Sequence, residues 1–124
     1  RTVYCRVPGE RGPATRVENR APCASANPYL AFAAAFAAGL DGIEKKIDPG
    51  VHAEGDIYGV EPGTYDTVPF YLRDALEELK ADTVLCEAIG PELIQAFVAL
   101  KEDELDRFRK HVTDWEFREY ACQL

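Results

Sequence analysis

The sequence lacks the short motifs that mark the best-known enzyme sites. It contains no GxxxxGK loop before Ser or Thr, no GxGxxG after a predicted strand, no HExxH and no GxSxG. Its cysteines show no CxxC pair and no other metal-ligand spacing. We therefore expect no nucleotide-loop, zinc-protease or serine-hydrolase site. We expect the four cysteines to be free, buried thiols. We also expect the protein to be in the reducing cytoplasm. The cysteines are Cys5, Cys23, Cys86 and Cys122.

An excess of positive charge is also missing. The 14 Lys and Arg residues face 22 Asp and Glu residues, a formal net charge of −8. This balance argues against nucleic acids and membrane surfaces as partners. The positive charge is concentrated at the start, where residues 1–20 hold five arginines and two glutamates, 5 − 2 = +3, so the other residues carry 9 − 20 = −11. A small anionic ligand would therefore be held by the opening segment.

No uninterrupted apolar run is long enough to span a bilayer. Residues 21–40 carry no charge, but Pro22, Asn27, Pro28 and Gly39 interrupt them and leave a helix of only about 13 residues. Asn27 is a good N-cap, and Pro28 suits the first position of a helix. Because this helix is apolar on every face, we expect it to be buried all round in the core.

The order of the patterns predicts an α+β fold in one domain, residues 1–124. Residues 1–21 read as an antiparallel hairpin whose strands, 1–7 and 15–21, are joined by a loop of about six residues. Two strands alone are not stable, so we expect the hairpin to belong to a larger sheet. Residues 27–124 are predicted to be mainly helical, with a long loop over 48–68. Later helices are expected to start at Pro69, Asp82 and Pro91, and Thr113 is expected to cap the last one.

A charged row in the second strand is the strongest candidate site. Side chains alternate along a strand, so Arg16, Glu18 and Arg20 share one face. Two guanidiniums beside a carboxylate suit a site that holds an anion together with a hard metal ion. The alternative is an edge strand whose charges pair with one another, and spacing alone favours this alternative.

Three motifs, taken in order, resemble the C-terminal part of the catalytic domain of glutamine synthetases. Residues 16–22 (Arg-Val-Glu-Asn-Arg-Ala-Pro) resemble the family's Arg-Ile/Val-Glu-x-Arg-x-Pro strand. Residues 26–31 resemble its Ala-Asn-Pro-Tyr-Leu-Ala helix start, and residues 38–43 its Ala-Gly-Leu-Asp-Gly-Ile helix end. The three together are specific, and weaker similarity extends over essentially the whole chain. The resemblance implies that the hairpin is part of the family's larger catalytic sheet.

The resemblance also implies a role for each charged residue of the hairpin. Glu18 would ligate the metal ion that bridges the nucleotide phosphates. Arg20 would be catalytic, contacting both the glutamate substrate and the transferred phosphoryl group, while Arg1 would bind the substrate carboxylate. Arg6 and Arg16 would bind the nucleotide phosphates. The match around Arg1 is looser, because the family's Ser-Ala pair is Thr-Val here.

The implied reaction is ATP-dependent ligation. The γ-carboxylate of glutamate is phosphorylated, and ammonia or an amine attacks the γ-glutamyl phosphate. Mg²⁺ or Mn²⁺ would be the cofactor, and the full-length protein would be a dodecamer-like homo-oligomer. The family's other metal ligands and its N-terminal domain should precede Arg1, so we expect the 124-residue fragment to be inactive alone. The alternative is a non-catalytic helical module of the same descent, used for assembly or binding.

Two finer questions stay open in the sequence. Asn19 makes the strand resemble family members that join glutamate to amines or polyamines rather than to ammonia. Tyr58 lies near the position of a tyrosine that some bacterial members adenylylate, but the flanking residues differ. A packing role for Tyr58 is therefore the favoured interpretation.

Overall fold

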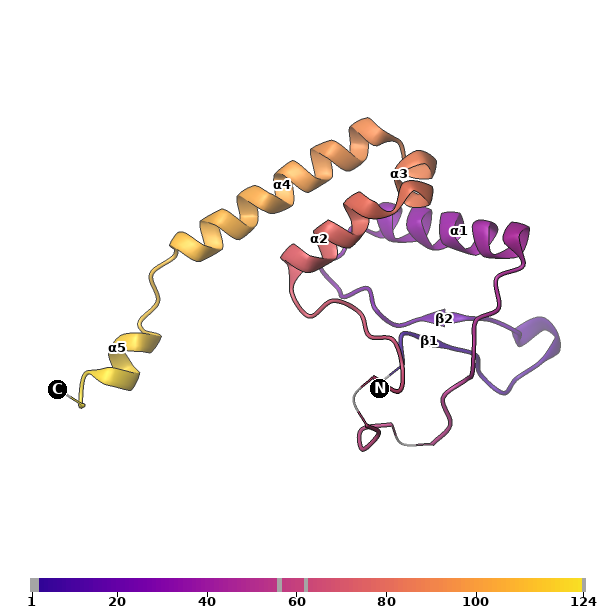
Figure 1. The fold of residues 1–124 in the computed structure, drawn as a ribbon, viewed down its shortest axis with the longest axis horizontal. Helices are drawn as coiled ribbons and strands as arrows, with labels where there is room; N and C mark the ends of the chain where they lie inside the picture. Colours follow the sequence, from indigo (N-terminus) through magenta and orange to yellow (C-terminus); the bar gives the residue numbers. More distant parts are fainter. Residues whose placement is uncertain (1–2, 56, 62, 124) are drawn as a thin grey trace.

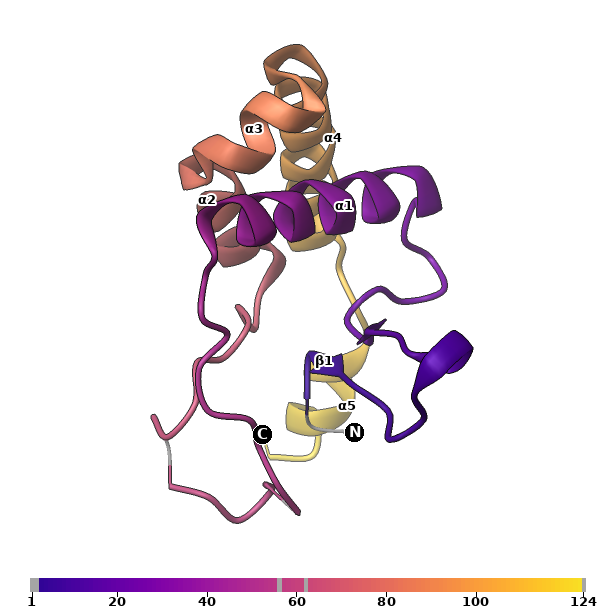
Figure 2. The ribbon, with the colours of Figure 1, turned by 90° about the vertical axis from the view of Figure 1, so that its right-hand side faces the viewer.

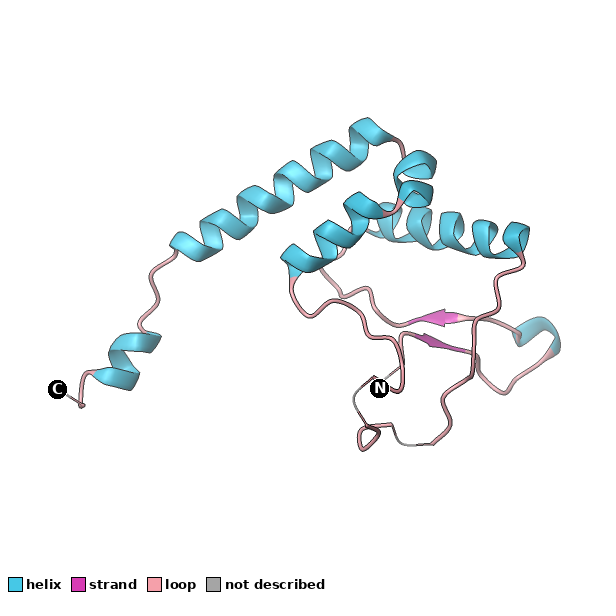
Figure 3. Ribbon diagram, viewed as in Figure 1, coloured by secondary structure: helices cyan, strands magenta, loops and turns pink. Residues whose placement is uncertain are grey.

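A short hairpin followed by helices forms the fold, as seen in a computed structural model that describes residues 3–55, 57–61 and 63–123. Figures 1 and 3 show the strands as a small part of a mainly helical chain. This arrangement confirms the predicted α+β class. The elements, in chain order, are β1 (Cys5–Arg6), the 3-10 helix η1 (Gly12–Ala14), β2 (Glu18–Asn19), α1 (Pro28–Lys45), α2 (Leu72–Ala81), α3 (Thr83–Ile89), α4 (Pro91–Lys110) and α5 (Trp115–Tyr120).

The hairpin is antiparallel, as predicted, but its strands are much shorter than 1–7 and 15–21. Cys5 lies opposite Asn19 and Arg6 opposite Glu18. One further bond continues the pairing, from the backbone N–H of Arg20 to the carbonyl of Tyr4, 2.9 Å. Within the described residues the sheet has only these two strands. A pair with no third strand beside it has little to keep its ends extended, which accounts for the short ladder.

Helix α1 begins where the sequence predicts, but it is not buried. The Asn27 side chain accepts hydrogen bonds from the backbone N–H groups of Tyr29 at 3.0 Å and Leu30 at 3.4 Å, and Pro28 occupies the first turn. No residue of α1 falls in the buried class, so the prediction of burial all round is wrong. Its packing partner is α3. This packing leaves the large apolar side chains of α1 from Tyr29 to Ile43 mostly exposed.

Of the next two helices, α3 has a side-chain cap and α2 has none. Helix α2 starts at Leu72 rather than at the predicted Pro69, and its N-cap residue, Tyr71, makes no side-chain cap, so capping does not explain this start. Helix α3 has such a cap, since the Asp82 carboxylate accepts from the backbone N–H of Leu85 at 2.9 Å. Gly90, with φ of 104°, ends α3 and allows α4 to begin at Pro91, as predicted.

A small core holds α2, α3 and α4 together. Its buried members are Leu76, Ile94 and Val98, and the half-buried Cys86 packs against them. At the edge, the Lys80 ammonium links α2 to α4 through Glu102 at 2.7 Å and also pairs with Glu77 at 2.9 Å. The hydrogen bond to Glu102 is the largest cause that raises the pKa of Lys80 above its ordinary 10.5, followed by the bond to Glu77.

Beyond this core, α4 carries the chain away from the rest of the molecule to α5 (Figure 1). Helix α5 begins at Trp115 with Asp114 as its N-cap residue, one position after the predicted Thr113. The Thr113 hydroxyl still accepts from the backbone N–H of Trp115 at 3.4 Å.

Within the described residues, no single helix is long and apolar enough to cross a membrane. Only Thr83–Ile89 and Pro91–Tyr120 taken together have the length and composition of a span, and this pair is bent by 107°.

The hairpin and the long loop between α1 and α2 lie on the same side of α1 (Figures 1 and 2). The described residues of 48–68 form neither helix nor strand, as predicted. Tyr58 in this loop is 75% exposed, which does not support a packing role.

Three of the four cysteines, Cys5, Cys23 and Cys122, are exposed, so the prediction of buried thiols is wrong for these three.

Candidate functional site

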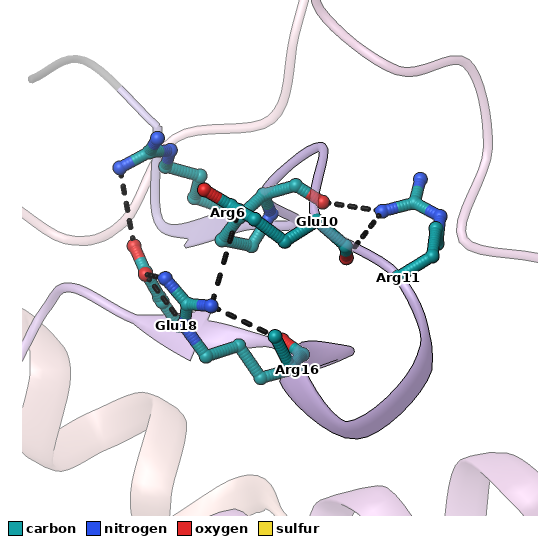
Figure 4. A network of polar contacts seen from close by, with 7 residues as sticks. Arg6, Glu10, Arg11, Arg16 and Glu18 are labelled. Carbon is teal, nitrogen blue, oxygen red and sulfur yellow. Dashed lines mark hydrogen bonds and ion pairs between the residues drawn. The ribbon is translucent and has the colours of Figure 1, made fainter.

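The hairpin register brings two arginines onto one carboxylate. Arg6 lies directly opposite Glu18, and its Nη1 is 3.3 Å from Glu18 Oε2. Arg16 lies two residues before Glu18 on the same face, with Nη2 at 2.8 Å and Nε at 3.0 Å from Glu18 Oε1. Figure 4 shows both guanidiniums turned toward this carboxylate. Each oxygen of Glu18 therefore has its own cationic partner.

The loop of the hairpin adds a second carboxylate and a third guanidinium. Glu10 Oε2 lies 3.9 Å from Arg16 Nη1, and the same nitrogen donates to the carbonyl of Ala14 at 3.1 Å. The Arg11 guanidinium donates hydrogen bonds to the backbone carbonyls of Pro8 and Glu10, so its side chain stabilises the turn. Sequence reasoning took Glu10 and Arg11 only as turn residues. Their charge and their place between two arginine-bearing strands were the signal that could have included them.

The structure brings together some of the predicted site residues and not others. Arg6, Arg16 and Glu18 form the charged cluster, which we call the hairpin cluster. Arg20 is exposed, and within the described part of the chain it makes no ion pair. Arg1 lies outside the described residues. The alternative of a self-paired edge strand thus holds for Arg16 and Glu18, but not for Arg20.

The hairpin cluster is accessible to ligands. The side chains of Arg6 and Arg16 are 54% and 48% exposed, and that of Glu18 is 29% exposed. Ion pairs at this exposure contribute little stability, because water already solvates both charges. The two arginines can therefore exchange their ion pairs with Glu18 for ion pairs with a bound anion at little cost in free energy. Planar guanidiniums can bind phosphate through two parallel hydrogen bonds, so the cluster is chemically suited to phosphate.

The carboxylate is also a ligand of the kind that magnesium takes. Mg²⁺ is usually held by one or two protein carboxylates together with substrate phosphates and water. Among the described residues there is no group of three or more His, Cys, Asp or Glu that could form a complete metal cage. Glu18, beside two arginines whose chemistry suits phosphate, therefore fits as one ligand of a shared site, and not as a complete site.

The comparison with protein families identifies the chain. A model described as glutamine synthetase, catalytic domain, matches residues 1–120. The chain therefore belongs to the glutamine synthetase family, and it corresponds to the C-terminal part of the catalytic domain. The match covers the hairpin, α1 and the later helices, so it confirms the resemblance predicted from the motifs.

Several known glutamine synthetases are similar to this chain over nearly its whole length. A glutamine synthetase of Methanococcus voltae is 44% identical over 126 residues, which cover 98% of this chain and 28% of the relative. Glutamine synthetases of Thermotoga maritima and Methanocaldococcus jannaschii are 42% and 43% identical, each over 97% of this chain and 28% of the relative. The chain thus spans little more than a quarter of the length of the relatives that it matches.

Proposed function

We propose that this chain forms one wall of the active site of an ATP-dependent glutamate ligase. The observation that carries the proposal is the hairpin cluster, in which the antiparallel register places Arg6 and Arg16 against Glu18. Membership of the glutamine synthetase family supports the reaction class. In this proposal Arg6 and Arg16 hold the nucleotide phosphates, and Glu18 supplies one ligand to the metal ion. A bound Mg²⁺ or Mn²⁺ would neutralise phosphate charge.

The remaining roles concern glutamate. Arg20 is the proposed catalytic arginine, which holds the glutamate substrate and the phosphoryl group in transit, and Arg1 is the proposed partner of the substrate carboxylate. Phosphoryl transfer depends chiefly on positioning and charge stabilisation. A guanidinium that is exposed and not engaged by a carboxylate of the described chain, as at Arg20, can serve both. The nitrogen nucleophile, ammonia or an amine, then displaces phosphate from the γ-glutamyl phosphate.

The setting of the reaction is part of the same proposal. All four cysteines are free thiols, which supports a reducing compartment such as the cytoplasm. The open faces of α1 support burial against more protein in the full-length enzyme, which we propose to be a dodecamer-like homo-oligomer of the family type. Because the described residues contain no group of three or more possible metal ligands, the chain alone is proposed to be inactive.

A chimera tests the proposed function directly. The chain replaces the corresponding segment of the Thermotoga maritima relative, to which it is 42% identical. ATP-dependent γ-glutamyl amide formation is then measured for the chimera and for the 124-residue chain, with ammonia and with amines as acceptors. We expect an active chimera and an inactive chain. Arg16→Ala and Glu18→Ala should each lower the activity of the chimera by about a hundredfold, as for other lost transition-state contacts.

The matched control is Arg73→Ala on α2, which removes an exposed arginine outside the hairpin cluster and should leave activity unchanged. A chimera that assembles and is folded by circular dichroism, yet makes no γ-glutamyl amide, would contradict the catalytic role. That outcome would favour the alternative, a non-catalytic helical module used for assembly or binding. Activity in the isolated chain would contradict the claim that it is only one wall of the site.

A further inference from the structure

The two arginines proposed to bind phosphate are already occupied by the protein's own carboxylate. Arg16 holds Glu18 Oε1 through two nitrogens, at 2.8 Å and 3.0 Å, and Arg6 holds Oε2 at 3.3 Å (Figure 4). A phosphate that uses these guanidiniums must therefore compete with Glu18. A cation that uses the Glu18 carboxylate must likewise compete with two arginines.

This arrangement links the two competitions. When an anion takes Arg6 and Arg16, the Glu18 carboxylate loses both partners and becomes available to a cation. When a cation takes Glu18, both guanidiniums become available to an anion. Because binding linkage is reciprocal, each ligand must raise the affinity for the other by the same factor. Direct attraction between the two bound ligands would add to this effect.

We propose that the hairpin cluster is an ion-pair exchange site, in which Glu18 acts as an internal competitor that suppresses binding of polyphosphate without a divalent cation. The inference rests on the proposed phosphate role of Arg6 and Arg16. It assigns to Glu18 a second task besides ligating a metal. In this chain the carboxylate holds both arginines in place when no ligand is bound, and it makes the site selective for the metal complex of a polyphosphate over the bare anion.

The exchange is feasible because the broken contacts are weak and accessible. All three side chains are partly exposed, and pairs of this kind contribute only modestly to stability. Glu10 limits the freedom of Arg16 during the exchange. Its carboxylate lies 3.9 Å from Arg16 Nη1, and the Ala14 carbonyl accepts a hydrogen bond from the same nitrogen. These contacts can hold the Arg16 guanidinium near the loop after its ion pair with Glu18 breaks.

The test is a titration of the 124-residue chain with inorganic tripolyphosphate at low ionic strength, with EDTA or with Mg²⁺. Arginine side-chain N–H signals in NMR report binding at Arg6 and Arg16 without any need for catalysis. With EDTA, Glu18→Gln should bind tripolyphosphate about two- to tenfold more tightly than the wild type, because two exposed ion pairs no longer compete. Mg²⁺ should tighten binding more for the wild type than for Glu18→Gln.

Two variants separate exchange from net charge. Glu87→Gln on α3 makes the same charge change at an exposed position remote from the hairpin, and it should leave the affinity near that of the wild type. Glu10→Gln should give a smaller gain than Glu18→Gln, because Glu10 lies farther from Arg16.

Equal affinity of the wild type and Glu18→Gln in EDTA, weaker binding by Glu18→Gln, or an equal gain in Glu87→Gln would each overturn the exchange. Such results would leave the proposed phosphate role intact, because the arginine signals would still respond to tripolyphosphate. Absence of any response in all variants would contradict the phosphate role itself, and the exchange with it.

Discussion

At the scale of single residues, local contacts change the acidity of the Cys23 thiol. Its Sγ lies 2.9 Å from the Ser25 hydroxyl, in the exposed turn that leads from the hairpin to α1. The hydrogen bonds from the Ser25 hydroxyl and then from the Ser25 backbone lower the pKa of the Cys23 thiol below its ordinary 9.0. The thiolate is the reactive form, so Cys23 should react at a lower pH than an unperturbed thiol.

We expect Ser25→Ala to shift the pH profile of Cys23 alkylation by iodoacetamide upward. Removal of the hydroxyl donor makes the thiolate less stable, so a higher pH is needed for the same rate. Peptide mass spectrometry resolves the rate at Cys23 from the rates at the other cysteines. Ser25→Thr keeps the hydroxyl and should keep the wild-type profile. Identical profiles for Ser25→Ala and the wild type would show that the hydroxyl has no such effect.

At the scale of elements, the contact among α2, α3 and α4 rests on very few buried side chains. Leu76 is 3% exposed, and Ile94 and Val98 are each 8% exposed. Leu76→Ala should lower the free energy of unfolding of this helical unit by about 2–4 kcal/mol, through lost burial and the cavity left behind. Urea denaturation followed by circular dichroism measures the change.

Leu100→Ala on α4 is the matched control for that substitution. Leu100 is 55% exposed, so its truncation removes little buried surface and should cost less than about 1 kcal/mol. If the two variants were destabilised equally, the helices would not pack through the face that carries Leu76.

At the scale of the whole molecule, a stripe of large apolar side chains along α1 is exposed to solvent. Its large apolar side chains are spaced three or four residues apart and are between 65% and 83% exposed. They are Tyr29, Phe32, Phe36, Leu40 and Ile43. A contiguous apolar surface of this kind favours association in water.

We therefore expect the isolated chain to self-associate as its concentration rises, with Phe36→Gln weakening the association. A polar side chain in the middle of the stripe must be desolvated when the stripe is covered. Sedimentation velocity over a wide concentration range measures the effect. Val51→Gln, at an 86% exposed position in the loop, is the control and should associate like the wild type. A chain that stays monomeric over the whole concentration range would show that the apolar stripe of α1 does not drive self-association.

The elements that were predictable are those specified by a few adjacent residues. The Asn27-Pro28 pair set the start of α1, Asp82 capped α3, and Pro91 began α4. The start of α2 was not predictable in this way, because the helix begins after Tyr71 without a side-chain cap. In the hairpin, the direction of pairing was predictable from alternation and turn residues, whereas its extent depended on neighbouring strands that the described residues do not include.

The candidate site was predictable in its residue types and only partly in its contacts. Motif similarity selected Arg6, Arg16 and Glu18, and the structure brings these three together. Alternation also placed Arg20 on the same row, but this residue stays outside the cluster. The charge of Glu10 and its place between the strands marked it as a candidate, but its contact with Arg16 depends on the conformation of the loop.

The sequence by itself determined the family, the starts of α1, α3 and α4 and the charges gathered in the hairpin, because each depends on residues close together along the chain. Only the tertiary structure decided that both oxygens of Glu18 face arginines, since strand register joins Arg6 to a residue 12 positions away. It also decided that α1 is exposed. Burial depends on what covers a helix, and the apolar composition of α1 could not show that none of its residues is buried in the part of the chain described.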